Sequence, residues 1–337
     1  MLDEERMAHV VQLQHPARGR AVARVEGDGL RLCNGPASVY ELALLAIEAG
    51  DTLRDTLDRC AGQSSLDYNA VYDGRSEWRL LPSIDHPEEP ARCLVTGTGL
   101  THLRSAQSRD AMHTEGAASD SMVMYRWGVE GGRPASGRAG IAPEWFYKGN
   151  GAIVRAHGDP LVVPEFGEAG GEEAEIAGVY LIDCDGTPRR LGMTAGNEFS
   201  DHVLEEKNYL YLAPSKLRTC ALGPELALDA PFASVQGHVT IRRGGTILWQ
   251  QEFMTGEEHM CHSLANLEHH HFRYPQHRRP GDIHVHFFGV AVFSSGEGVR
   301  LADGDEMELG FAGYGRPLRN PLRVEPPSER LWPVQPL

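Results

Sequence analysis

Two glutamates with strand spacing are the first candidates for chemistry. Glu173 and Glu175 stand at the start of an apolar run that ends at Ile182. Because side chains alternate between the two faces of a strand, both carboxylates project to one side, where they repel each other unless a cation lies between them. Oxygen ligands of this kind suit Mg²⁺, Mn²⁺ or Ca²⁺. A solvated strand end in an acidic protein has the same pattern, so the pair alone leaves both interpretations open.

Two later segments strengthen the metal interpretation. Residues 192–202 read GMTAGNEFSDH and residues 213–224 read APSKLRTCALGP. With the glutamate pair, they resemble the fumarylacetoacetate hydrolase superfamily, which has an ExE pair, then a GxTxxNDxS element and then a KSxDxxxxGP element. The resemblance implies one divalent metal ion, with Mg²⁺ as the first candidate, held by three carboxylates: Glu173, Glu175 and Glu198. It makes Lys216 the active-site lysine, although Leu217 and Thr219 replace the serine and aspartate that usually follow.

Other stretches match the same family in the same order. They are Leu94–His102, Pro143–Gly149, Ala156–Pro160, Pro280–Asp282 and Asp303–Leu309. The resemblance implies an α+β, mostly β fold, namely a mixed β-roll with a smaller N-terminal α/β domain. We expect that domain and its linker at residues 1–90 and the metal-binding catalytic domain at residues 91–337. The resemblance also implies a homodimer and a small 2-oxo acid as the substrate.

The match breaks where the family's C–C hydrolases carry a His-x-x-Glu dyad that activates water. Ser105 and Ser108 stand at those positions, and a serine without a partner cannot act as a general base. The stretch 105–140 around them has few large apolar residues, as in an active-site lid or a disordered surface insertion. Three of its side chains could replace the dyad or be surface residues only: Asp110, His113 and Glu115.

Loss of the dyad beside a retained metal site favours elimination over hydrolysis. The chain resembles the bacterial branch of the superfamily that dehydrates 2-keto-3-deoxy-L-arabonate in pentose and sugar-acid catabolism, with 2,5-dioxopentanoate as the product. By this resemblance the 2-oxo acid chelates the metal, Lys216 removes the C3 proton and Glu144 protonates the departing C4 hydroxyl, or the two roles are reversed. Four further residues are expected to bind substrate: Phe146, Lys148, Ser200 and Arg218.

Simpler interpretations and rival functions accompany this hypothesis. Lys216 could only form an ion pair with the acidic cluster, and Glu144 could occupy a solvated turn. An acylpyruvate or 2,4-dioxo-acid hydrolase or decarboxylase would use the same site, and a non-catalytic sugar-acid or metal-binding protein would keep only its ligands. Histidines crowd residues 259–286, but no HExxH motif or paired Cys/His spacing predicts zinc there. His284 and His286 share one face of a predicted strand and could line the pocket, although a His-rich surface loop plus strand residues is the expected arrangement.

Strands must position these residues. Alternating and apolar runs predict them at Cys93–Thr96, Leu161–Val163, Ala174–Ile182, Thr240–Arg242, Thr246–Gln250, Ile283–Val292 and Glu306–Phe311. Near the N-terminus, short strands between His9 and Leu32 surround a turn at Glu26–Gly29. A helix is predicted over Ser38–Cys60, because Ser38 and Glu41 have the spacing of a capping box.

Composition restricts the class of protein and its partners. The 337 residues carry a formal net charge of −15, and 41% of them are hydrophobic, which is enough for a sizeable core. An acidic surface repels nucleic acid and anionic membranes. The six cysteines are scattered without a CxxC pair, as is typical of reduced thiols. No signal peptide or long apolar span is visible. We therefore expect a cytoplasmic protein with no nucleic-acid or membrane partner.

Overall fold

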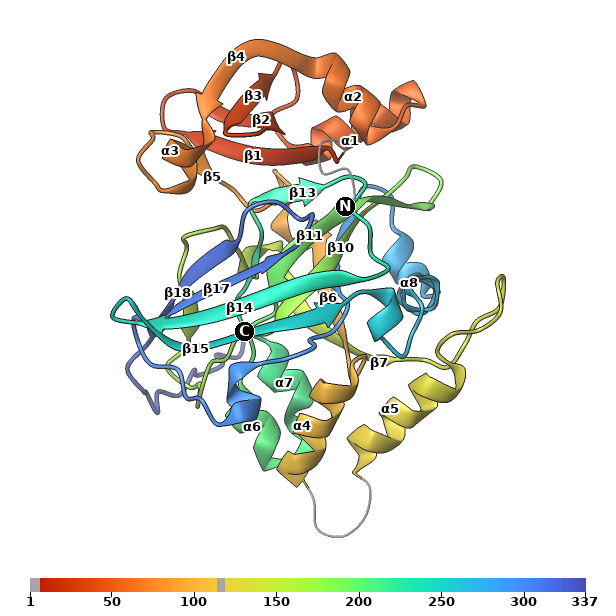
Figure 1. Cartoon of the computed structure of the whole chain (residues 1–337), viewed down its shortest axis with the longest axis vertical. Coiled ribbons are helices and arrows are strands. Elements are labelled where there is room, and N and C mark those ends of the chain that lie inside the picture. The colour runs from red at the N-terminus through yellow and green to blue at the C-terminus, as the bar shows by residue number, and fades with distance from the viewer. Residues whose placement is uncertain (1–6, 114–118) are drawn as a thin grey trace.

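The computed structural model describes residues 7–113 and 119–337, and strands dominate it (Figure 1). Thirteen strands in these residues form one sheet. They are β1 (His9–His15), β2 (Gly19–Glu26), β3 (Gly29–Cys33), β4 (Ala61–Asp67), β5 (Arg79–Leu80), β6 (Cys93–Gly99), β7 (Glu144–Asn150), β8 (Val154–Arg155), β10 (Ala174–Ile182), β11 (Pro188–Asn197), β12 (Cys220–Leu222), β13 (Glu225–Ala227) and β16 (Ile283–Phe287). A second sheet contains β9 (Leu161–Val163), β14 (Val235–Arg243), β15 (Thr246–Thr255), β17 (Glu306–Phe311) and β18 (Leu318–Val324). The predicted mostly β, α+β class is confirmed.

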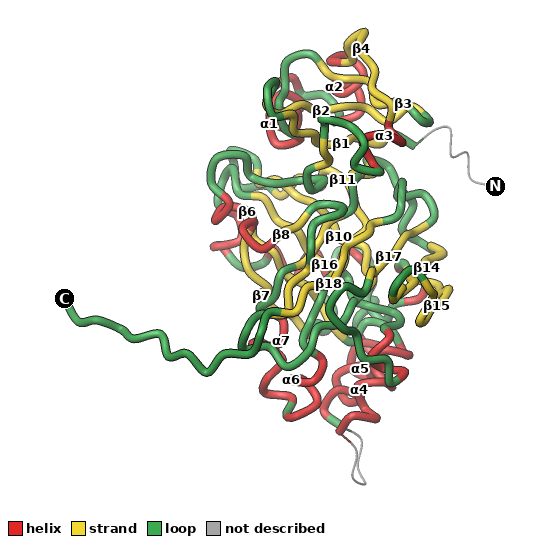
Figure 2. Tube along the Cα trace, turned by 90° about the vertical axis from the view of Figure 1, so that its left-hand side faces the viewer, coloured by secondary structure: helices red, strands yellow, loops and turns green. Residues whose placement is uncertain are grey.

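The helices are short. They are α1 (Val39–Ala49), α2 (Leu53–Cys60), α3 (Tyr68–Tyr72), α4 (Leu103–His113), α5 (Asp120–Gly131), α6 (His202–Lys207), α7 (Leu212–Lys216) and α8 (Leu264–Phe272). Short 3₁₀ segments are η2 (Pro90–Arg92), η3 (Gly151–Ile153), η4 (Tyr209–Tyr211), η5 (Glu257–His259), η6 (Pro275–Arg278) and η7 (Ser294–Glu297). Helices α1 to α3 lie at one end of the molecule and α4 to α7 at the other (Figures 1 and 2). None of the helices in the described part of the chain has the length and apolar character that a membrane span needs.

Strand β10 lies inside the large sheet, in the order β11–β10–β16–β6–β7. All of its residues are buried. On one face Ile176 joins an apolar cluster with Leu309 of the second sheet, and on the other face Val179 joins a cluster with Leu42 of α1. A strand that is covered on both faces needs a nearly continuous apolar run, which explains why its bounds agree with the prediction.

The N-terminal unit contains the predicted strands and turn. Strands β2 and β3 form a hairpin in which Glu26 pairs with Gly29. Ser38 caps α1 by accepting the Glu41 N–H at 3.1 Å, as predicted. The single helix predicted to Cys60 is wrong, because Gly50 adopts a left-handed φ of 69° that ends α1 before α2 begins. Strand β1 pairs with β13, so the N-terminal strands continue the large sheet, and the proposed division near residue 90 stays a prediction.

Two predictions for the catalytic region need correction. The strand predicted over Ile283–Val292 ends at Phe287 as β16, because the backbone turns at Gly289, where φ is 102°. The stretch 105–140, predicted to lack regular structure, contains most of α4 and all of α5. Ser119 caps α5 by accepting the Met122 N–H at 3.3 Å. These helices lie at the same end of the molecule as α6 and α7 (Figures 1 and 2).

Candidate metal centre and active site

Glu173, Glu175 and Glu198 meet at the open end of the β10–β11 hairpin. Ala174 pairs with Asn197, so the flanking residues Glu173 and Glu198 are neighbours, and the Glu198 N–H donates to the Glu173 carbonyl at 2.9 Å. One carboxylate oxygen from each glutamate lies within 4.8 Å of the other two. The three side chains are at most 3% exposed. The predicted grouping of carboxylates is therefore present, and we call it the glutamate triad.

Two lysines compensate the triad. Lys216 Nζ lies 2.5 Å from Glu173 Oε1 and 2.8 Å from Glu198 Oε2. Lys148 Nζ lies 2.6 Å from Glu198 Oε1. Burial opposes ionisation of Glu173, but Lys216 and a hydrogen bond from His202 hold the pKa of Glu173 well below its usual value. The ion pair considered for Lys216 thus exists, and it places the amine directly beside the candidate ligands.

Glu175 is the least compensated carboxylate of the triad. Burial, together with repulsion from Glu198 and Glu173, raises the pKa of Glu175 well above its ordinary value. Its Oε2 accepts the Gly289 N–H at 2.7 Å. Three buried carboxylates, one of which is disfavoured in its ionised form by burial and by its like-charged neighbours, fit a hard divalent cation. The residues therefore suit the metal that the sequence resemblance implied.

Strand β7 directs three predicted residues to one side. Burial alternates along it, with Glu144, Phe146 and Lys148 buried and the intervening Trp145 and Tyr147 exposed. Glu144 Oε1 accepts the hydroxyl hydrogen of Tyr209 of η4 at 2.9 Å. Since Lys148 on this face reaches Glu198, Glu144 belongs to the buried side of the strand that faces the triad. The solvated turn considered for Glu144 is wrong.

The remaining predicted contacts divide into two groups. The Phe146 ring lies under Lys216 Nζ, 5.1 Å from the ring centroid. The Ser200 hydroxyl donates to Glu198 Oε2 and accepts from Lys216 Nζ, both at 2.9 Å. Arg218 instead forms an ion pair of 3.0 Å with Asp201, which caps α6. The structure thus brings Phe146 and Ser200 to the triad and Arg218 to the helix beside it. A substrate contact from Arg218 stays a prediction.

Two residues at the site were not assigned from the sequence. His202 Nε2 lies 3.0 Å from Glu173 Oε1, and Glu205 Oε1 lies 3.4 Å from Lys216 Nζ. Both belong to α6, which begins directly after Asp201. A helix that starts four residues after the third ligand was the available indication, because positions one and four of such a helix lie on the same face and can both point back to the strand end.

One of the two positions of the missing dyad, Ser105, lies close to the triad. Ser105 lines the same small cavity as Glu173, Glu175 and Phe146, and its hydroxyl donates to the His102 carbonyl at 3.0 Å. Asp110 accepts hydrogen bonds from Ser119 at the start of α5. His113 ends α4, but its side chain is outside the description, and Glu115 lies outside the described residues. A role for these three lid candidates stays a prediction.

The His-rich segment lies on the other face of the sheet. His284 and His286 of β16 pair with Tyr180 and Gly178, whose side of β10 is opposite to that of Glu175. His284 Nδ1 lies 2.9 Å from Nε2 of His271 on α8, which covers this face. His284 and His286 are strand residues, as predicted, but they do not line the triad's cavity. His271 is buried on α8, so the expected surface loop is wrong for it. Among the described residues, the glutamate triad is the one group that could hold a metal ion.

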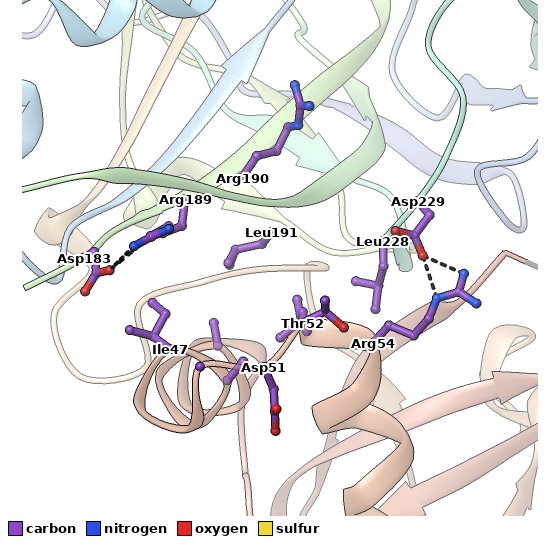
Figure 3. A pocket seen from close by; sticks show the side chains of 14 residues that line it. Ile47, Asp51, Thr52, Arg54, Asp183, Arg189, Arg190, Leu191, Leu228 and Asp229 are labelled. Atoms are coloured by element: carbon purple, nitrogen blue, oxygen red, sulfur yellow. Dashed lines mark hydrogen bonds and ion pairs between the residues drawn. The ribbon is translucent and has the colours of Figure 1, made fainter.

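A larger cavity of about 410 Å³ lies between α1, the start of α2 and β11 (Figure 3). Ile47 and Leu191 form part of its apolar wall. Its charged side chains pair with neighbours, as in the ion pair of 2.6 Å between Arg54 and Asp229. Among the described residues the triad, and no set of residues in this cavity, could hold a metal ion, so we place the candidate active site at the triad.

Comparisons with known proteins agree with this architecture. No protein-family model matches the chain. The chain is 22% identical over 316 residues to a Haloferax volcanii protein named "Probable 2-keto-3-deoxyxylonate dehydratase", and the match covers 91% of this chain and 96% of that protein. The structure is similar to that of 2-keto-3-deoxy-D-arabinonate dehydratase complexed with magnesium and 2,5-dioxopentanoate, with a TM-score of 0.69. The two chains are 17% identical, and the match covers 94% of this chain and 99% of the dehydratase.

A 2-hydroxyhepta-2,4-diene-1,7-dioate isomerase from Mycobacterium marinum has a TM-score of 0.58 at 15% identity, with coverage of 94% of this chain and 99% of the isomerase. The shared architecture therefore extends over nearly the whole of each chain. These similarities confirm the fold that the motifs implied: the protein has the mixed, mostly β fold of the fumarylacetoacetate hydrolase superfamily.

Proposed function

We propose that this protein is a metal-dependent hydro-lyase that removes water from a 2-keto-3-deoxy-pentonate to form 2,5-dioxopentanoate. One observation carries the proposal: the buried glutamate triad holds the Lys216 amine within 2.8 Å of two candidate ligands. Glu144 faces the triad from β7 and is the second group that proton transfer requires. Similarity to two proteins named as dehydratases of 2-keto-3-deoxy sugar acids supports this substrate class.

Glu173, Glu175 and Glu198 would hold the divalent ion, with Mg²⁺ as the first candidate. When bound, the ion would polarise the 2-oxo group and so acidify the C3 proton. Lys216 would accept that proton as a neutral amine, because the bound ion would replace it as the counter-charge of Glu173 and Glu198, the two carboxylates that its amine contacts. Ser200 and the Phe146 ring would restrict its motion.

Glu144 would deliver a proton to the departing C4 hydroxyl, and its hydrogen bond from Tyr209 would hold the carboxyl group in place. Tautomerisation of the resulting 5-hydroxy-2-oxo-3-enoate would then give 2,5-dioxopentanoate. The reverse assignment exchanges the roles of Lys216 and Glu144.

We further propose a homodimer located in the cytoplasm. Large apolar side chains around the site are exposed in the single chain: Leu210, Tyr211 and Leu217 are 85%, 48% and 52% exposed. Exposed apolar side chains that cluster on one part of a surface are typical of contact regions. All six cysteines are unpaired, which agrees with a reducing compartment.

An assay of both enantiomers of the substrate tests the function. Carbon 4 is the one stereocentre left in a 2-keto-3-deoxy-pentonate, so the D and L forms cover the substrate panel. We expect Mg²⁺-dependent formation of 2,5-dioxopentanoate from at least one enantiomer and loss of activity with a chelator. Cleavage of an acylpyruvate without dehydration of either enantiomer would instead favour the hydrolase alternative.

A further inference from the structure

We infer that His202 is a positioning residue that orients Glu173 for the metal ion, and that Ser295 fixes the orientation of the His202 ring. The inference rests on the proposed metal site and adds two residues to it that neither the motifs nor the proposed mechanism uses. Its basis is a continuous hydrogen-bonded series from Ser295 through the imidazole ring to the carboxylate of Glu173.

The hydrogen bonds define the direction of donation. His202 Nε2 lies 3.0 Å from Glu173 Oε1, and Ser295 Oγ lies 2.7 Å from His202 Nδ1. An ionised carboxylate can only accept, so the Nε2 hydrogen must point at Glu173. In the neutral ring Nδ1 then accepts the Ser295 hydroxyl, and in the charged ring it donates to the same oxygen. Donation to Glu173 is therefore the same in both states.

The ring has almost no freedom to move. His202 is 3% exposed, and the centroid of the Phe293 ring lies 5.0 Å from the centroid of the imidazole ring. On another side the ring approaches Gly171 so closely that a Cβ atom there would lie 2.4 Å from Nδ1. A glycine at position 171 is thus what makes room for the imidazole.

The backbone of His202 is held as well. His202 is the first residue of α6, whose cap Asp201 accepts the Leu204 N–H at 3.1 Å. Arg218 and the Glu168 N–H bind the other oxygen of Asp201, at 3.0 and 2.9 Å. The helix start is therefore tied to two other segments of the chain. This accounts for the position of Arg218, which holds Asp201 and thereby the histidine that follows.

His202 and Lys216 approach the same oxygen of Glu173. All described contacts of this carboxylate fall on Oε1, which orients the group and leaves Oε2 for another ligand. Hydrogen-bond partners that orient a ligand in this way typically change metal affinity by about 10-fold to 100-fold when they are removed. Since Lys216 is also expected to take part in proton transfer, His202 is the partner whose role is positioning alone.

The experiment measures metal affinity without substrate. Mn²⁺ binding to the full-length protein is followed by the loss of the free-ion signal in electron paramagnetic resonance and by calorimetry. We expect His202→Leu to weaken binding by about 10-fold to 100-fold. His202→Gln, whose amide can still donate to Glu173, should recover most of that loss. Ser295→Ala should weaken binding by a few-fold and broaden the spectrum of the bound ion.

Ser294→Ala is the matched control. Ser294 is the chain neighbour of Ser295, but its hydroxyl donates to Glu172 Oε2 at 2.7 Å rather than to the histidine. This variant should lower the melting temperature and keep the wild-type affinity for Mn²⁺. An affinity that falls equally in both serine variants would overturn the inference, because it would indicate general loosening of η7.

The outcomes separate this inference from the proposed function. Wild-type affinity in folded His202→Leu protein would overturn the positioning role even if the enzyme dehydrates its substrate. If His202→Leu fails to fold, Ser295→Ala decides, and unchanged affinity and spectrum there would overturn the inference. Tight Mn²⁺ binding by the wild type and weaker binding by His202→Leu would support the inference even if neither protein turns over a 2-keto-3-deoxy-pentonate.

Discussion

Glu173 and Glu198 are neighbours across the open end of the β10–β11 hairpin, joined by the hydrogen bond from the Glu198 N–H to the Glu173 carbonyl. The register of the hairpin therefore determines the metal site. A slip of one residue would turn either carboxylate to the opposite face of the sheet. Directly after Glu198, Phe199 adopts a φ of 32°, and its carbonyl accepts from Lys148 Nζ at 2.7 Å. A strained backbone position beside a ligand is typical of functional sites.

Replacing one ligand should abolish metal binding. We expect Glu198→Gln to weaken Mg²⁺ or Mn²⁺ binding by at least about 100-fold, because an amide supplies neither the charge nor the basicity of a carboxylate. Calorimetry measures the affinity, and the rise in melting temperature on adding metal should disappear with it.

Glu172→Gln is the control for that substitution. Glu172 is also buried, but it binds Ser294 through both oxygens, at 2.7 Å each. Burial raises the pKa of Glu172, so a neutral amide should be tolerated. We expect unchanged metal affinity, and equal losses in the two variants would contradict the assignment of the triad.

Removing the amine of Lys216 should separate catalysis from metal binding. Lys216→Met keeps the approximate volume but leaves Glu173 and Glu198 without a shared counter-charge. Turnover should fall by about 100-fold or more. Because the bound metal must then offset more repulsion, the rise in melting temperature with Mg²⁺ should exceed that of the wild type. Lys207→Met, at the exposed end of α6, should change neither quantity, and near-normal turnover in Lys216→Met would sink the catalytic assignment.

Alternation along β7 makes a sharp prediction for Glu144. Glu144→Gln should lower kcat by about 10²-fold to 10⁴-fold with little change in metal affinity, because the amide keeps the hydrogen bond from Tyr209 but cannot supply a proton. Tyr147→Phe, on the exposed face of the same strand, should behave as the wild type. Steady-state kinetics with the active enantiomer checks both, and a kcat of Glu144→Gln within a few-fold of wild type would exclude Glu144 as acid or base.

The sequence predicted those parts of the site that follow from local pattern. The apolar run of β10 required burial on both faces, and the motifs around Glu198 and Lys216 supplied residues distant in the chain. Ser38 could be recognised as a cap because capping depends on residues three positions apart. In contrast, the end of β16 depends on Gly289 turning its N–H toward Glu175, which is a tertiary contact. No local pattern encodes such a contact.

His202 was missed for a related reason. Its importance arises from three-dimensional contacts with Glu173 and with Ser295, which lies far along the chain, and a single histidine after a ligand motif has no periodicity of its own. The crowded histidines of residues 259–286 do converge in part, since the ring of His271 contacts those of His277, His284 and His286, but they do so away from the triad. His284 and His286 belong to the face covered by α8, away from the triad.

These buried histidines predict how stability depends on pH. Burial, with smaller effects from neighbouring histidines, lowers the pKa of His284 and of His286 to about 3. In the unfolded chain both should titrate near the ordinary value of about 6.5. Between these values the unfolded state binds protons that the folded state does not, so stability is complete above pH 6.5 and is lost as the pH falls toward 3. His284 and His286 together should account for roughly 2–4 kcal/mol of the fall in the free energy of unfolding, measured with urea, between pH 7.5 and pH 5.0.

Comparison of two histidine variants isolates this effect from other titrating groups. His286→Gln removes one ring that is buried in the folded state. Between pH 7.5 and pH 5.0 the free energy of unfolding of this variant should therefore fall by about 1–2 kcal/mol less than that of the wild type. His269→Gln changes an exposed ring on α8 and should keep the wild-type dependence. The same pH dependence in both variants would show that the β16 histidines are not held neutral by burial.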